Sequence, residues 1–138
     1  MTRRSHTGFV IFVNKAPIIW FSKRQQTVEL SAFLSEFIAM KSCIEEIRGL
    51  HNKLRMFGIP IQDDGQVHIF CDNQSVLNNC SNIESVLNKK HSLVAYHMAR
   101  WAVATGEVCI GWINGAFNLA DAFTKRFPKV KRQNLFWN

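Results

Sequence analysis

Several features that would mark a secreted, zinc-binding or membrane protein are missing from this sequence. Its four cysteines include no Cys-x-x-Cys pair, and at least two of them, Cys71 and Cys109, lie inside apolar runs typical of strands, so we predict reduced thiols in the core. No apolar run approaches membrane-spanning length, and no charged and apolar leader opens the sequence. We therefore expect an intracellular protein of the cytoplasm or the nucleus, neither secreted nor membrane-bound.

Acidic residues are scarce. Ten acidic residues face 17 lysines and arginines, which gives a formal net charge of +7 and an isoelectric point of about 9.6. The positive excess is spread along the chain, and this distribution favours a polyanionic partner, with nucleic acid as the first candidate. The alternative is a basic surface that only keeps the protein soluble.

Internal repeats, linkers and low-complexity segments are absent as well. A chain of 138 residues with 47% hydrophobic content can bury the core of one globular domain. We assign residues 1–127 to this domain and residues 128–138 to a basic and aromatic C-terminal tail.

Strand-like and helix-like apolar patterns alternate along the chain. Gly8–Val13 and Pro17–Ser22 predict a β-hairpin, and the three and four spacing of apolar residues predicts one long helix from about Ser31 to Phe57. The remaining expected elements are a strand at Val67–Cys71, a short helix ending near Asn79, an irregular segment at Ser81–Asn88, a helix at Lys89–Thr105, a strand at Glu107–Ile113 and a helix at Asn118–Phe127. This order predicts an α/β fold with a mixed sheet flanked by helices.

One acidic residue, Asp72, follows directly on the expected strand at Val67–Cys71 and precedes a helix start. In open α/β sheets, ligands bind at the carboxyl ends of the strands, and a carboxylate held there suits a hard divalent cation. The alternative is that Asp72 only caps the following helix, since caps are commoner than metal ligands.

Two further acids share the unusual setting of Asp72. Glu36 is embedded among apolar residues of the long helix, and Asp121 lies in the final helix within Asn-Leu-Ala-Asp-Ala-Phe. A carboxylate among apolar neighbours is costly unless it is paired or metal-bound. Clustered carboxylates of this kind can hold two cations that cleave a phosphodiester, but sequence spacing alone does not show that the three acids meet.

Five segments together resemble a known family. They are TRRSHTGFVIFVNKAPIIWFSKRQQTV, LSAFLSEFIAM, IFCDNQSVLN, NKKHSLVAYHMAR and GWINGAFNLADAFTKRF. In wording and order they are similar to the ribonuclease H region at the carboxyl end of copia-type LTR retrotransposon Pol polyproteins. The resemblance covers about Thr2 to Phe127, nearly the whole chain.

This resemblance implies a ribonuclease H-like fold with a five-stranded mixed sheet and an Mg²⁺-dependent carboxylate cluster that hydrolyses the RNA strand of RNA–DNA hybrids. It assigns the catalytic and metal-ligating roles to Glu36, Asp72 and Asp121, and we predict that these carboxyl groups lie within about 10 Å of one another, close enough to share a pair of metals. It also implies a reverse transcriptase domain upstream in the same polyprotein as a partner.

The chain departs from the family at its start. The family's first catalytic aspartate lies on a strand just upstream of the Thr-Arg-Arg-Ser motif, and this sequence begins inside that motif. We therefore expect the chain alone to be a weak or inactive nuclease. The alternative is a non-catalytic remnant that binds nucleic acid.

The missing strand would be the central one of the family's sheet. Its absence would leave rows of unpaired backbone groups, each costing on the order of 1 to 3 kcal/mol when buried. We expect the Gly8–Val13 strand to pair directly with Val67–Cys71, or else the chain to be poorly stable and prone to edge-to-edge association.

Candidate nucleic-acid contacts follow from the same resemblance. Lys90 and Arg100 stand where the family's basic helix stands, and lysine and arginine neutralise phosphates whatever the base sequence. Asn73 and Ser75 are candidates for a phosphate contact at a helix N-terminus, with helix capping as the default. Structural roles are expected for four other residues, His91, His97, Trp101 and Trp112, the two tryptophans as core residues.

Overall fold

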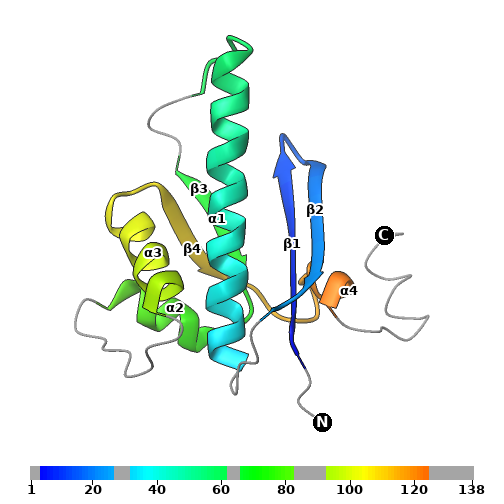
Figure 1. Cartoon of the computed structure of the whole chain (residues 1–138), viewed down its shortest axis with the longest axis vertical. Coiled ribbons are helices and arrows are strands. Elements are labelled where there is room, and N and C mark those ends of the chain that lie inside the picture. Colours follow the sequence, from blue (N-terminus) through cyan, green and yellow to red (C-terminus); the bar gives the residue numbers. More distant parts are fainter. Residues whose placement is uncertain (1–3, 27–31, 62–65, 83–92, 125–138) are drawn as a thin grey trace.

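The computed structural model describes residues 4–26, 32–61, 66–82 and 93–124 (Figure 1). The elements, in chain order, are β1 (His6–Val13), β2 (Ala16–Arg24), α1 (Ala32–Met56), β3 (Val67–Cys71), α2 (Gln74–Ser81), α3 (Leu93–Ala104), β4 (Val108–Trp112) and α4 (Asp121–Thr124). This order confirms the predicted α/β class. The expected irregular segment at Ser81–Asn88, the start of the Lys89–Thr105 helix and the tail at 128–138 lie wholly or largely outside the described residues.

Strands β1 and β2 form the antiparallel hairpin that the sequence predicts. The two residues between them, Asn14 and Lys15, both have positive φ, at 48° and 68°, as a two-residue turn matched to the twist of the strands requires. Across the hairpin the rings of Phe9 and Phe21 stack with centroids 4.9 Å apart. One face of the hairpin is therefore apolar and available for packing.

Strands β3 and β4 form a second, parallel pair, with Val67 opposite Val108 and Cys71 opposite Trp112. The chain between them contains α2 and α3, the helical crossover that a parallel pair needs. Both helices pack against the same core as β3 and β4, with Val76, Tyr96 and Val108 almost fully buried.

Helix α1 lies between the two sheets and packs against both (Figure 1). Phe37 and Ile44 belong to the core shared with α2 and α3, whereas Cys43 and Ile47 belong to a second cluster with Phe9 and Ile11 of β1. The helix ends at Met56, one residue before the predicted end at Phe57, and is soon followed by Gly58, whose φ is 70°. Its amide donates to the carbonyl of Arg55 and the next amide donates to that of Leu54, which satisfies carbonyls at the helix end.

The expected single mixed sheet is replaced by two separate two-stranded sheets. Among the described strands, β1 pairs only with β2 and β3 pairs only with β4, so the first of the two expected outcomes, direct pairing of Gly8–Val13 with Val67–Cys71, is wrong. The second, poor stability with edge-to-edge association, stays a prediction. Side chains of β3, Val67 and Ile69, instead pack against the cluster under the hairpin. Strands β1 and β3 therefore contribute side chains to the same apolar cluster, but no backbone hydrogen-bond ladder joins them.

The short helix α4 fastens the end of the described chain to the hairpin. The hydroxyl of Ser22 donates to the carbonyl of Phe123 at 2.6 Å. A Cβ placed on Gly8 would lie only 2.6 Å from Thr124 Cγ2 and 3.1 Å from the Ala120 carbonyl oxygen. Glycine at this position is therefore what lets α4 approach β1 so closely.

The cysteines are all free thiols, as predicted, with Cys43, Cys71 and Cys80 buried and Cys109 half-buried. The tryptophans correct the sequence prediction, because Trp101 is 60% exposed and Trp112 is 51% exposed. Within the described part of the chain, no helix is both long enough and apolar enough to cross a membrane.

Candidate metal centre

The carboxyl end of β3 carries the candidate site. The chain leaves β3 at Cys71, passes through Asp72 and Asn73, and enters α2 at Gln74. Asn73 has extended backbone angles, and its side-chain oxygen accepts from the Ser75 amide at 3.0 Å. Asn73 is thus the N-cap of α2, so the alternative interpretation of Asp72 as the cap is wrong, and its carboxylate serves no such purpose.

Glu36 of α1 reaches the same place from a distant part of the sequence. One ligand atom each of Glu36, Cys71 and Asp72 lies within 4.8 Å of the others, with both carboxylates half-buried. Glu36 lies near the start of the long helix α1, and Cys71 and Asp72 lie at the end of the paired strand β3. Rigid elements therefore hold these side chains. Carboxylate oxygens at this separation are suitable ligands for Mg²⁺.

The loop after β4 closes over Asp72. A Cβ on Gly115 would lie 3.3 Å from Asp72 Oδ2, and the Trp112 indole N–H donates to the Asp72 carbonyl at 3.3 Å. The Ile113 amide donates to the Cys71 carbonyl at 3.0 Å. These contacts hold the end of β3 in place. Because residue 115 is a glycine, only backbone lies beside the Asp72 carboxylate on that side.

Cys71 is the residue of this cluster that sequence reasoning placed only in the core. Burial, the main cause, raises the pKa of its thiol to about 11, with the charges of Glu36 and Asp72 acting in the same direction. Mg²⁺ prefers carboxylate oxygens to the softer sulfur of a cysteine. The Asn73 amide donates to its sulfur at 3.3 Å, so Cys71 shapes the strand end while the two carboxylates supply the hard ligands. Its position directly before Asp72 was the available signal.

Asp121 is described but lies outside the group within 4.8 Å. It is the first residue of α4 and is buried, at 8% exposure, beside the hairpin. Glu36 and Asp72 are thus brought together as predicted, and the convergence of Asp121 with them stays a prediction.

The candidate nucleic-acid contacts have mixed outcomes. Arg100 donates to the Tyr96 hydroxyl at 3.1 Å and to the Asn82 carbonyl at 2.9 Å, and its guanidinium lies 5.1 Å from the centre of the Tyr96 ring. It therefore holds α3 to the end of α2. His97 is exposed with its ring edge-on to Tyr96. Two other calls, Lys90 and His91, lie outside the described residues.

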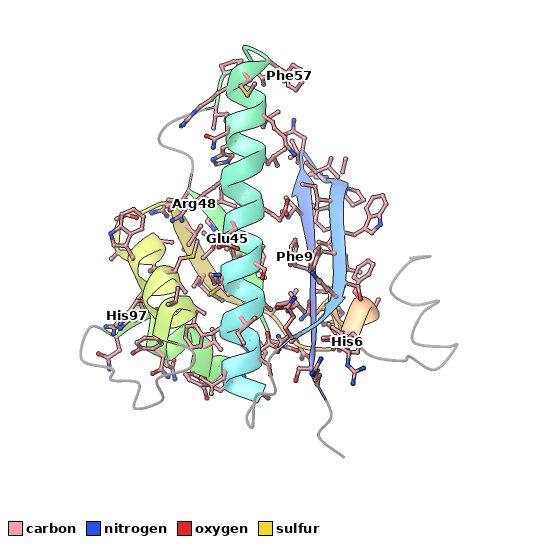
Figure 2. The ribbon with its side chains drawn as sticks, viewed as in Figure 1. His6, Phe9, Glu45, Arg48, Phe57 and His97 are labelled. Carbon is pink, nitrogen blue, oxygen red and sulfur yellow. The ribbon has the colours of Figure 1, made fainter. Side chains whose placement is uncertain are left out.

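A bidentate ion pair joins α1 to the turn before β4. Arg48, which points from α1 toward the side of α3 and β4 (Figure 2), donates from Nε and one terminal nitrogen to Glu107 at 2.7 and 2.8 Å. Its guanidinium lies over the Trp101 ring. The hydrogen bonds from Arg48 hold the pKa of Glu107 below its usual range. No sequence pattern signalled this pair, because its members are 59 residues apart.

Comparison with curated proteins matches 94% of the chain to retrovirus-related Pol polyproteins of transposons. Identity is 28% over 130 residues to that of transposon RE2 and 27% to that of RE1, both from Arabidopsis thaliana, and 30% over 129 residues to that of TNT 1-94 from Nicotiana tabacum. The chain is homologous to a segment of retrotransposon Pol polyproteins. It spans only 9 to 10% of the length of these Pol polyproteins. No protein-family model and no solved structure matches it.

Proposed function

We propose that the chain is a ribonuclease H-like domain of a retrotransposon Pol polyprotein, a family domain that hydrolyses the RNA strand of RNA–DNA hybrids. The observation that carries the proposal is the approach of Glu36 and Asp72 to within 4.8 Å at the end of a strand. The similarity to Pol polyproteins over 94% of the chain supports it. We further propose that the chain alone is weakly active or inactive, and that the polyprotein's reverse transcriptase domain is its partner.

The donor set fits Mg²⁺, because two half-buried carboxylates from rigid elements converge and carboxylate oxygens are the ligands that this ion prefers. Glu36 and Asp72 would hold the ion, with Asp121 proposed as a further ligand. When bound at such a site, divalent cations activate a water and stabilise the leaving oxygen of a phosphodiester. The part of the chain is to fix the two carboxylates at one edge and to keep Cys71 and the loop after β4 packed against them.

Binding to the hybrid is proposed to be electrostatic. The chain carries a net charge of +7, and Lys90 and Arg100 are proposed to lie along the path of the phosphate backbone. Arg100 would contribute with the donors that its bonds to Tyr96 and Asn82 do not use, since a guanidinium has five. Asn73 caps α2 by accepting from the Ser75 amide, so any phosphate contact there would use the remaining amides of that helix start.

The test is a pair of measurements on the purified full chain and on Asp72→Asn. Titration with Mn²⁺, a paramagnetic stand-in for Mg²⁺, should broaden the amide signals of Asn73 and Gly115 in the wild type and leave them sharp in the variant. Incubation with a labelled RNA–DNA hybrid and Mg²⁺ should give slow cleavage of the RNA strand that Asp72→Asn removes. The matched control is Glu45→Gln, which neutralises an exposed carboxylate of α1 that pairs with Lys41.

The outcomes separate the two candidate functions. Hybrid binding without metal-dependent cleavage would identify a non-catalytic nucleic-acid-binding remnant. The proposal would be overturned if Mn²⁺ failed to broaden these amide signals and the chain showed no preference for an RNA–DNA hybrid over double-stranded DNA.

A further inference from the structure

Trp112, the last residue of β4, lies at the border of the candidate metal centre. It is opposite Cys71 in the parallel pair of strands, and its indole N–H donates to the backbone carbonyl of Asp72 at 3.3 Å. The residue is nevertheless 51% exposed. A large aromatic side chain therefore lies beside the carboxylates of this centre without belonging to the core.

The hydrogen bond to Asp72 fixes the ring and uses its polar group. An indole has one N–H donor and no acceptor, so the bonded side chain of Trp112 has only its aromatic surface left to offer to a ligand. The Ile113 amide donates to the Cys71 carbonyl at 3.0 Å, which ties the backbone next to Trp112 to the same strand end. The exposed aromatic surface is thus held in a defined place.

Trp101 provides a comparison, because it is exposed to a similar extent, at 60%, but its ring is already in contact with a cation. The Arg48 guanidinium lies over that ring, 5.6 Å from its centre. Among the described residues, no second ring and no guanidinium lies over Trp112. Trp112 also does not line the cavity of about 740 Å³ between β1 and β3, so its exposure does not depend on what occupies that cavity.

We propose that Trp112 is a stacking surface for an unpaired nucleobase of a strand whose phosphates reach the Glu36–Asp72 centre. The inference rests on the proposed function, since it adds a base-binding subsite to the same site. Aromatic side chains stack on unpaired bases of any sequence, whereas the bases of a duplex already stack on one another. The subsite therefore accepts a single-stranded extension of an RNA–DNA hybrid.

Charge and connectivity favour a nucleotide over an apolar peptide as the ligand of Trp112. The net charge of +7 attracts a polyanion. The base of a nucleotide is one sugar away from its phosphate, and the indole is bonded to the backbone of Asp72 itself, so a short piece of strand can contact both the ring and the metal centre. A single exposed ring would offer an apolar peptide little area to bury.

The first test observes individual tryptophans of the full chain by ¹⁹F NMR after incorporation of 5-fluorotryptophan. The sequence has four tryptophans, and substitution of each by phenylalanine assigns the signals. A thymidine oligonucleotide of about eight nucleotides, added without metal, should shift the Trp112 signal and leave the Trp101 signal in place. Binding that leaves the Trp112 signal unmoved would involve phosphates alone and would overturn the proposal, as would a complete lack of binding.

The second test separates stacking on bases from contact with phosphates. An abasic oligonucleotide of the same length has the same phosphates and no bases. Loss of the bases should weaken binding to the wild type about tenfold and binding to Trp112→Leu hardly at all, because the ring is absent from that variant. Trp101→Leu is the matched control and should discriminate between the two oligonucleotides as the wild type does. Equal discrimination by Trp112→Leu and the wild type would contradict the proposal.

Trp112→Phe separates the role of the ring from that of its hydrogen bond. Phenylalanine retains an aromatic surface but has no N–H for the Asp72 carbonyl, whereas leucine lacks both. The phenylalanine variant should keep most of the discrimination between the two oligonucleotides, and urea unfolding checks that both variants fold. A loss in Trp112→Phe as large as in Trp112→Leu would show that the residue acts by holding Asp72, which would overturn stacking.

A hybrid substrate distinguishes failure of this subsite from failure of the proposed nuclease. An RNA–DNA hybrid with an unpaired extension should bind the wild type about tenfold more tightly than a blunt hybrid, and Trp112→Leu should bind both alike. Equal affinity of the wild type for the two hybrids would overturn the subsite and leave the metal centre unaffected. A shift of the Trp112 signal by single strands, without Mn²⁺ broadening or hybrid preference, would retain the subsite and overturn the nuclease.

Discussion

Single residues set how closely the elements of this molecule approach one another, and Gly8 is the sharpest case. The strand containing it passes under α4 with no room for a methyl group, since the nearest atom would be 2.6 Å from a Cβ. Cys71 at the end of β3 is buried beside two carboxylates, and this burial raises the pKa of its thiol to about 11. Of the two positions, Gly8 is the one where a single added methyl group must displace a neighbour.

Gly8→Ala should destabilise the protein by about 1 to 3 kcal/mol, because the new methyl group must push away Thr124 and the Ala120 carbonyl. Gly49→Ala is the matched control, since no atom lies within 4 Å of its Cβ position inside α1, and it should stabilise the protein by about 1 kcal/mol. Urea unfolding of both variants measures the difference. Equal effects on stability would show that α4 does not rest on β1 in solution.

Elements far apart in sequence are joined by a few polar contacts, of which the Arg48–Glu107 pair between α1 and the start of β4 is the best formed. The side chains are 35% and 25% exposed, so solvent screens part of their attraction. The pKa of Glu107 is lowered in the folded state by the hydrogen bonds from Arg48. The stabilisation is therefore present above the ordinary carboxyl pKa of 4.5 and is lost as the pH falls through the lower folded-state value.

Glu107→Gln should cost about 1 kcal/mol of unfolding free energy at pH 7 and progressively less as the pH falls through the lowered folded-state pKa of Glu107, because protonation removes the charge that Arg48 pairs with. Urea unfolding at pH 7 and at a series of pH values below 4.5 provides the comparison. Glu45→Gln, which removes only an exposed pair with Lys41 on α1, should cost at most about 0.5 kcal/mol. A cost for Glu107→Gln that does not change with pH would indicate lost packing rather than a lost ion pair.

The elements themselves were largely predictable, because apolar spacing and end signals are local. The long helix expected from about Ser31 to Phe57 is observed as Ala32–Met56, and the expected strand at Val67–Cys71 has the same bounds. What could not be predicted depends on partners distant in sequence. Pattern alone treated Trp101 as a core residue, whereas its ring lies beneath Arg48 at the surface.

In the candidate site, too, the individual residues could be predicted from the sequence but their contacts could not. Asp72 was recognisable from its place at a strand end, and Glu36 from its apolar surroundings, yet their approach depends on how α1 crosses the end of β3. The failure of β1 to pair with β3 was equally hidden, since periodicity predicts strands but not which strands share a ladder. The role of Arg100 in bonding Tyr96 and Asn82 likewise appears only in the folded chain.

At the scale of the whole molecule, charge governs the proposed encounter with nucleic acid. The net charge of +7 should make binding to an RNA–DNA hybrid strongly salt-dependent and only weakly dependent on base sequence, because the candidate contacts reach phosphates. Titrations of one hybrid at two salt concentrations, and of two hybrids at one concentration, test both parts. An affinity that hardly changes with salt would contradict the electrostatic account.

The placement of α1 between two unjoined sheets has a consequence for how the molecule opens. No ladder connects the hairpin to the parallel pair within the described residues, so they are coupled by α1, by side-chain packing and by the contact of α4 with the hairpin. Such an arrangement divides a fold into two cooperative units with separate opening free energies. Amides of β1 and β2 should therefore exchange through a cheaper opening than those of β3, β4 and α3, while the amides of α1, which both units need, exchange only when the whole molecule unfolds.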